Sequence, residues 1–196
     1  MFKAKLSEIF SPAAISARET ILSDLGHDPF GDPLLWERVV ATTLGGSITS
    51  KQCAWDVEVN IWGKDCRIEV KFSCAYSALF SEIRGLDCSR NVFKWAGLRR
   101  GRADAFVMIG LDVDDAVYAL VIGDRSIVGA ATSLTMTAPS SAKAEAKMNW
   151  AIVPFGEILP AVARTCHNDY DAPMRRAGTA KRAKADMAIR DMIGGE

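Results

Sequence analysis

The sequence predicts a mixed α/β (α+β) fold, in which helices flank a central mixed sheet. Two runs of alternating polar and apolar residues, 55–61 and 66–73, flank a Gly63-Lys64-Asp65 turn, and such a pair is typical of a β-hairpin. Two nearly continuous apolar runs, 103–111 and 116–122, favour central strands that are covered on both faces. Helical patterns lie on either side of the hairpin along the chain, so helices and strands are expected to share one core.

Two helices are predicted before the hairpin, because each has a capping residue followed by proline and ends at a glycine. The first begins at Ser11-Pro12 and ends at Gly26. The second begins at Asp32-Pro33 and ends at Gly45. An apolar stripe runs along one side of the first helix and consists of Ala14, Ala17, Ile21 and Leu25.

The second helix carries the first candidate site residue, Glu37. Trp36, Val40 and Leu44 form the buried stripe of this helix, and Glu37 borders that stripe. A glutamate near the start of a helix is favoured by the helix dipole and can simply be exposed. An acid at the edge of an apolar face can instead belong to a functional site. The residues alone leave both interpretations open.

The hairpin has one apolar face and one polar face. The polar face gathers four charged residues: Asp56, Glu58, Glu69 and Lys71. In the register that the predicted turn sets, Asp56 lies opposite Lys71. Glu58 then lies opposite Glu69. Opposite side chains are about 5 Å apart, so carboxylates in this patch repel one another and need a cation, which either Asp56 or Glu58 can bind.

Asp56, twelve intervening residues and then Glu69-Val70-Lys71 resemble the signature of the PD-(D/E)XK nuclease superfamily, which has the restriction-endonuclease-like fold. The proline of that signature is absent, and Trp55 precedes Asp56 instead. The resemblance covers residues 32–122 approximately and implies an αβββαβ core. The predicted order of helix, three strands, helix and two strands agrees with such a core.

The resemblance also implies a catalytic site. Asp56, Glu69 and the carbonyl of Val70 are expected to bind Mg²⁺, for which Mn²⁺ can substitute. Lys71 is expected to orient the attacking water or to stabilise charge that develops on the phosphate. Glu37 matches the helix-borne acid that many of these enzymes add to their metal site.

A third helix is predicted from Asp87 or Ser89 to about Arg100. Its inward-facing residues are Val92, Phe93 and Ala96. Basic residues gather on it and just after it: Arg90, Lys94, Arg99, Arg100 and Arg102. We expect these five to contact DNA phosphates, and the alternative is a solvated face.

The remaining predicted elements are a short strand at 47–52, an edge strand at 149–153 and a helix at 155–165 that Pro160 kinks. The length of 196 residues and the 49% of hydrophobic residues predict one globular domain, residues 1–172. A basic, alanine-rich tail follows at 173–196.

Composition restricts the location and the redox chemistry of the protein. No apolar run reaches the roughly 18 residues of a membrane span, and Glu8 and Pro12 interrupt any signal-peptide core, so a cytoplasmic location without a membrane partner is expected. The cysteines are odd in number and form no Cys-x-x-Cys pair: Cys53, Cys66, Cys74, Cys88 and Cys166. Buried, reduced thiols are therefore expected rather than disulfides or a zinc site.

The function predicted from these features is Mg²⁺-dependent hydrolysis of DNA. The formal net charge is zero, which argues against a general nucleic-acid coat but allows segregated basic surfaces. The resemblance implies a double-strand endonuclease of the restriction, defence or mobile-element type, often a homodimer. Two alternatives stay open: a catalytically inactive DNA-binding module on the same fold, and a chance motif on a solvated hairpin face.

Overall fold

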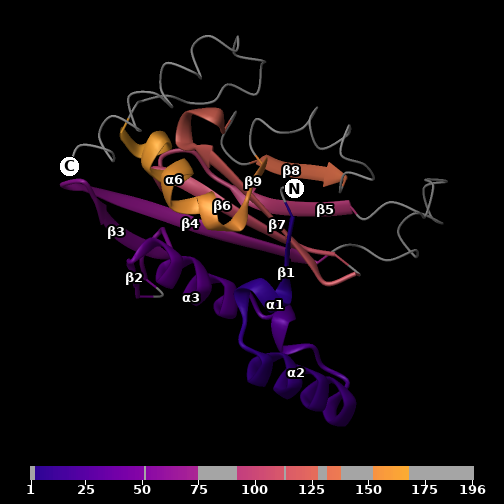
Figure 1. Cartoon of the computed structure of the whole chain (residues 1–196). Helices are drawn as coiled ribbons and strands as arrows, with labels where there is room; N and C mark the ends of the chain where they lie inside the picture. The colour runs from indigo at the N-terminus through magenta and orange to yellow at the C-terminus, as the bar shows by residue number, and fades with distance from the viewer. Residues whose placement is uncertain are drawn as a thin grey trace, which may run out of the picture.

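The computed structural model describes residues 3–50, 52–74, 92–112, 114–127, 132–137 and 152–167. It confirms the mixed α/β fold class. Helices cover one face of a central mixed sheet, and a two-stranded ribbon covers the other face (Figure 1).

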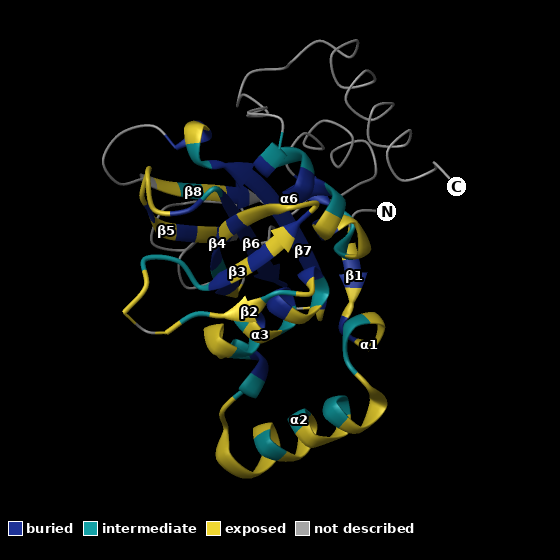
Figure 2. Ribbon diagram, turned by 90° about the vertical axis from the view of Figure 1, so that its left-hand side faces the viewer, coloured by how far each residue is buried: buried dark blue, intermediate teal, exposed yellow. Residues whose placement is uncertain are grey.

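The described residues form a seven-stranded central sheet. Its strands are β1 (Lys3–Lys5), β2 (Ser47–Ile48), β3 (Val57–Ile61), β4 (Lys64–Cys74), β6 (Ala105–Leu111), β7 (Ala116–Gly123) and β9 (Ile152–Val153). Their order is β1-β7-β6-β4-β3-β2, and β9 also pairs with β7. β4 and β6 are parallel, and the other pairs are antiparallel. Every residue of β6 and β7 is buried, as the continuous apolar runs predict (Figure 2).

The β3–β4 hairpin turns one residue earlier than predicted. Ile61 pairs with Lys64, so the loop is Trp62-Gly63 rather than Gly63-Lys64-Asp65. Trp62 and Gly63 have φ angles of 50° and 82°, and a tight two-residue hairpin loop of type I′ needs positive φ at both positions. A tryptophan is an unusual residue at such a φ angle, which is why a pattern centred on Gly63 misplaces the turn.

Two helices cover one face of the sheet: α3 (Pro33–Leu44) and α6 (Ile158–His167). As predicted, Asp32 caps α3 by accepting a hydrogen bond from the backbone N–H of Leu34 at 2.9 Å. The Trp36 side chain is fully buried, and its ring stacks on Phe72 of β4 with centroids 5.4 Å apart. α3 is thereby fixed against the hairpin, and this contact sets the position of Glu37.

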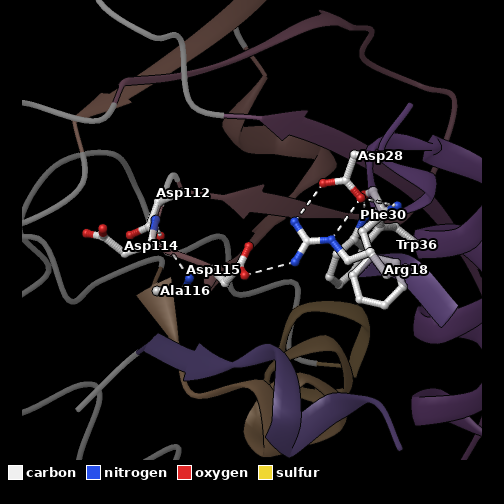
Figure 3. A network of polar contacts seen from close by, with 8 residues as sticks. All are labelled: Arg18, Asp28, Phe30, Trp36, Asp112, Asp114, Asp115 and Ala116. Carbon is white, nitrogen blue, oxygen red and sulfur yellow. Dashed lines mark hydrogen bonds and ion pairs between the residues drawn. The ribbon is translucent and has the colours of Figure 1, made fainter. Parts of the chain in front are cut away.

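The helix α2 (Pro12–Leu25) extends away from the sheet (Figures 1 and 2). It lies between α1 (Leu6–Ile9) and the 3₁₀ turn η1 (Pro29–Gly31), which place Leu6 and Phe30 in the core. No residue of α2 is buried, and Leu25 is 75% exposed, so the apolar stripe of this helix does not reach the core. Arg18 holds the helix instead, because its guanidinium pairs with Asp28 at 2.6 Å and with Asp115 of the β6–β7 turn at 2.9 Å (Figure 3).

A two-stranded ribbon covers the second face of the sheet: β5 (Val92–Leu98) and β8 (Thr132–Thr137). β5 contradicts the helix predicted from Asp87 or Ser89 to about Arg100, as far as residues 92–98 are concerned. Residues 87–91 lie outside the described residues. In Figure 1 the ribbon and α3 lie on opposite sides of the central strands. The prediction is wrong because the apolar spacing of this segment fits a strand as well, and because the second apolar face of β6 and β7 requires an apolar cover.

Burial along β5 follows the period of a strand. Phe93 and Trp95 are fully buried, and Lys94 is exposed between them. The indole N–H of Trp95 donates to the carbonyl of Ile109 on β6 at 2.9 Å. Ala96, predicted to face inward, is exposed.

The C-terminal part of the described chain partly follows the prediction. β9 is a two-residue edge strand, followed by the 3₁₀ turn η3 (Phe155–Glu157) and α6. Pro160 lies in the first turn of α6, where its missing N–H would have no helical partner, so the predicted kink within a longer helix is wrong. None of the helices in the described ranges is long and apolar enough to cross a membrane.

The expectation of buried thiols holds for only two of the cysteines in the described ranges. Cys66 and Cys166 are buried, and burial raises the pKa of both thiols. Cys53 and Cys74 are exposed. Cys88 and the predicted basic tail at 173–196 lie outside the described residues.

Candidate active site

Three segments meet at the candidate site: α3, the residues just before β3, and the middle of β4. Glu37 comes from α3, and Asp56 directly precedes β3. Glu69 and Lys71 lie two residues apart on β4. Side chains two residues apart on a strand point to the same face, so these two side chains leave the sheet together.

The register of the hairpin differs from the predicted register by two residues. Glu58 pairs with Arg67. The same register, continued, places Asp56 opposite Glu69. Asp56 is therefore not opposite Lys71, as predicted, and this pairing is corrected. Glu58 is not opposite Glu69 either. The polar residues still share one face, because a shift of two residues preserves the alternation.

Glu69 is the most unusual residue of the site, because it is an acid with only 4% of its surface exposed. Its Oε1 forms an ion pair with Nζ of Lys71 at 2.6 Å. Its Oε2 is buried and has no hydrogen-bond partner among the described residues. A buried polar atom without a partner costs about 1–3 kcal/mol, and more when it is charged. Glu69 therefore has one satisfied oxygen and one that a cation would satisfy.

Asp56 is tied to the strand that carries Glu69. Its Oδ2 accepts a hydrogen bond from the backbone N–H of Val70 at 2.7 Å. No other hydrogen bond to this carboxylate is formed within the described ranges, so Oδ1 can bind a further ligand. The bond through the Val70 N–H was not predicted, and the predicted role of the Val70 carbonyl as a metal ligand stays a prediction.

Glu37 brings a third acid to the site from α3. Its side chain is half-buried. Burial raises the pKa of this carboxyl, the negative charge of Asp56 raises it further, and the positive charge of Lys71 lowers it. Glu37 therefore lies within electrostatic reach of both residues.

Glu58 belongs to a different group of side chains. It is exposed, and its Oε1 accepts a hydrogen bond from Nε1 of Trp55 at 2.9 Å. The guanidinium of Arg67 lies over the Trp55 ring, 5.2 Å from its centre, and also pairs with Asp104 at 3.1 Å. Glu58 is thus held on the surface beside Trp55, whereas Asp56 contacts the backbone of β4.

The acids at the site fit a small, hard cation. Glu69 offers a buried oxygen without a partner, and Asp56 offers Oδ1. Mg²⁺ prefers oxygen ligands, keeps several waters and is usually held by one or two carboxylates. Within the described ranges, no group of three or more His, Cys, Asp or Glu side chains is arranged to hold a metal ion.

Four of the predicted DNA contacts lie on β5 and in the loop that follows it. The exposed basic residues are Lys94, Arg99, Arg100 and Arg102. Arg90 lies outside the described residues. The backbone N–H of Lys94 donates to Oγ of Ser73 at 3.1 Å, which ties β5 to β4. Ser73 shares the face of Glu69 and Lys71 on β4, so β5 and these two residues lie on the same side of the sheet.

No family model and no curated protein matches the chain.

A pocket of about 430 Å³ opens beside Glu37 and Asp56, and the sequence did not reveal it. Leu34 and Arg38 of α3 line it, together with Ile48 and Trp55 from the other side. These residues come from a helix, from the two-residue strand β2 and from a loop without a repeating pattern, so no periodicity marks them. The nearest sequence signal is the pair of opposite charges formed by Glu37 and Arg38.

Proposed function

We propose that the protein is a Mg²⁺-dependent nuclease that hydrolyses phosphodiester bonds in DNA. The observation that carries this proposal is Glu69, a buried carboxylate that shares Oε1 with Lys71 while Oε2 has no partner among the described residues. A cation held at Glu69 and the ammonium group of Lys71 beside it would supply the two positive charges that phosphoryl chemistry uses. The order α3-β2-β3-β4, with β6 parallel to β4, agrees with the core that the resemblance implies, although β5 stands where a helix is expected.

The residues of the site have separate roles in this proposal. Asp56 and Glu69 would hold the cation, and the Val70 N–H fixes Oδ2 of Asp56. When bound, Mg²⁺ would act as a Lewis acid that offsets the negative charge of the phosphate and lowers the pKa of a bound water. Lys71, whose side chain is 29% exposed, donates from Nζ to a phosphate oxygen or to the attacking water. Glu37 acts at the rim of the site, through water.

Double-stranded DNA is the proposed substrate. The exposed basic residues of β5 and the following loop contact its phosphates in this proposal: Lys94, Arg99, Arg100 and Arg102. A single site cuts one strand, so two copies of the chain are proposed to act on a duplex. The restriction, defence or mobile-element context is part of the same proposal.

Cleavage of supercoiled plasmid DNA tests the proposal. The wild-type chain is expected to nick and linearise the plasmid in Mg²⁺ or Mn²⁺ and to be inactive in EDTA. Glu69→Gln keeps the shape of the side chain but removes its charge, and it is expected to abolish cleavage. Glu58→Gln, an exposed acid on the same hairpin, is the matched control and should cleave at the wild-type rate. Equal cleavage by Glu69→Gln and wild type would reject the proposal.

A DNA-binding module without catalysis is the second candidate. The observation in its favour is the ion pair itself, because Nζ of Lys71 already contacts Glu69 and the two charges neutralise each other. Salt-dependent DNA binding by a wild-type chain that does not cleave in Mg²⁺ or Mn²⁺ would select this candidate.

A further inference from the structure

The pocket beside Glu37 and Asp56 has an apolar wall that metal binding does not use. Leu34 and Ile48 line this wall and are 50% and 45% exposed, although both are large apolar residues. Trp55 lines the same pocket, and the guanidinium of Arg67 lies over its ring. Exposed apolar side chains that gather in one concave site are typical of ligand binding.

The loop wall of the pocket is held in place by hydrogen bonds. The backbone N–H of Thr49 donates to the carbonyl of Asp56 at 2.9 Å, and the Thr49 hydroxyl donates to the carbonyl of Trp55. The N–H of Cys53 donates to the carbonyl of Ser50 at 2.9 Å. The backbone of the loop that carries Trp55 is therefore held in place before any ligand binds, which lowers the entropy lost on binding.

The charges of the pocket suit a phosphate only when a cation is present. Arg38 lines the pocket and forms no ion pair with the described residues. Glu37 and Asp56 line it too, and their negative charges repel a phosphate. A divalent cation at Asp56 and Glu69 would reverse the sign of the field at that end of the pocket.

We propose that this pocket receives one unpaired nucleotide of the DNA strand, with its base against Leu34, Ile48 and Trp55 and its phosphate near Arg38. This proposal rests on the proposed function, because the bound cation makes the acidic end of the pocket accept a phosphate. The nuclease then prefers DNA in which a nucleotide next to the cleaved bond is unpaired or can leave the stack.

The size of the pocket supports a single nucleotide over a duplex. A volume of about 430 Å³ lies within the range of roughly 300–1,000 Å³ that is usual for small-molecule sites. A base pair in a stack presents only its edges to a protein, whereas an apolar and aromatic wall suits the face of a base.

Chemical protection of Cys53 gives a direct test that does not depend on cleavage. Cys53 is exposed and lines the pocket, and Cys74 is an exposed cysteine outside it. Thymidine 5′-monophosphate, which has no phosphodiester bond to cut, is added with Mg²⁺, and N-ethylmaleimide labelling of each cysteine is followed by mass spectrometry. The nucleotide is expected to slow labelling of Cys53 at least fivefold in Mg²⁺, with no effect in EDTA and none at Cys74.

Variants of the wall give the second test. Leu34→Ala with Ile48→Ala is expected to weaken the binding of thymidine 5′-monophosphate about tenfold, as measured by calorimetry in Mg²⁺. Leu22→Ala, an equally exposed residue on α2 at 44%, is the control and should have no effect. Arg38→Gln is expected to weaken the binding of the nucleotide more than the binding of thymidine, because thymidine has no phosphate.

The outcomes separate this proposal from the proposed function. Mg²⁺ binding that depends on Glu69, without protection of Cys53 by the nucleotide, would overturn the pocket proposal and leave the metal site intact. Protection of the same size in EDTA would also overturn it, because the bound phosphate would then not need the cation. Protection that requires Mg²⁺ and is lost in the wall variant supports it.

Discussion

Replacing Glu69 with glutamine changes the charge of one buried side chain while keeping its shape. In the absence of Mg²⁺ the substitution has two opposite effects on the free energy of unfolding. It removes the ion pair with Lys71, whose side chain is 29% exposed and can turn to water, so the loss is about 0–1 kcal/mol. It also removes the charge on the unpartnered Oε2, whose burial costs about 1–3 kcal/mol. We therefore expect Glu69→Gln in EDTA to be as stable as the wild type, or more stable by up to about 3 kcal/mol.

The effect of Mg²⁺ should reverse this order. A ligand that binds only the folded state stabilises it by about 2.7 kcal/mol when its concentration is one hundred times the dissociation constant. For a chain of 196 residues, this corresponds to a rise in Tm of roughly 5–11 °C. The wild type should show this rise, and Glu69→Gln should show little or none, because the neutral amide is a poor ligand for Mg²⁺.

Thermal unfolding followed by circular dichroism, with and without Mg²⁺, measures both effects. Glu58→Gln is the control, since Glu58 is exposed on the same hairpin and should keep the Mg²⁺-dependent rise. The reasoning is refuted if Glu69→Gln keeps the full rise in Tm. It is also refuted if Glu69→Gln in EDTA is less stable than the wild type by about 3 kcal/mol or more, which is the cost of breaking a buried ion pair. Such a loss would mean that Lys71 has no access to water.

Three other predictions concern single side chains. Lys71→Ala should reduce cleavage about 10²–10³-fold while sparing the binding of Mg²⁺ and DNA, and cleavage at the wild-type rate would remove the catalytic role of this lysine. Lys94→Ala should weaken DNA binding similarly for all sequences and flatten its dependence on salt in an anisotropy titration, whereas an unchanged salt slope would assign Lys94 to solvent. Glu37 has a pKa raised above its ordinary value of 4.5, so the folded state binds its proton more tightly than the unfolded state, and stability should fall as pH rises from about that value through the folded pKa. Glu37→Gln should remove this part of the pH dependence in denaturant unfolding, and an identical pH profile would contradict the raised pKa.

The helix caps and the hairpin strands could be predicted from the sequence because they depend on neighbouring residues. Asp32 caps α3 through a backbone N–H two residues away. The alternation that defines β3 and β4 comes from side chains on successive residues of one strand. The same alternation places Glu69 and Lys71 on one face, whatever the register of the hairpin.

Neighbouring residues did not decide the structure of residues 92–98. Their apolar positions fit a helix and a strand, and the second apolar face of β6 and β7 selects the strand by burying Phe93 and Trp95. The exposure of α2 could not be predicted from the sequence either. Its stripe is apolar, and only the rest of the fold shows that no surface covers it. The helix is held instead by an ion pair between its own Arg18 and Asp28, and no pattern in the sequence marks this pair.

The sequence by itself determined which acids and which lysine lie on the hairpin, because covalent spacing and strand period place them. Only the tertiary structure decided that Oε2 of Glu69 is buried without a partner among the described residues, and that Glu37 lies beside Asp56. The same holds for the pocket next to them. Burial, the pKa of a carboxyl group and the volume of a pocket depend on atoms that distant segments bring together, and no local pattern of residue types records those distances.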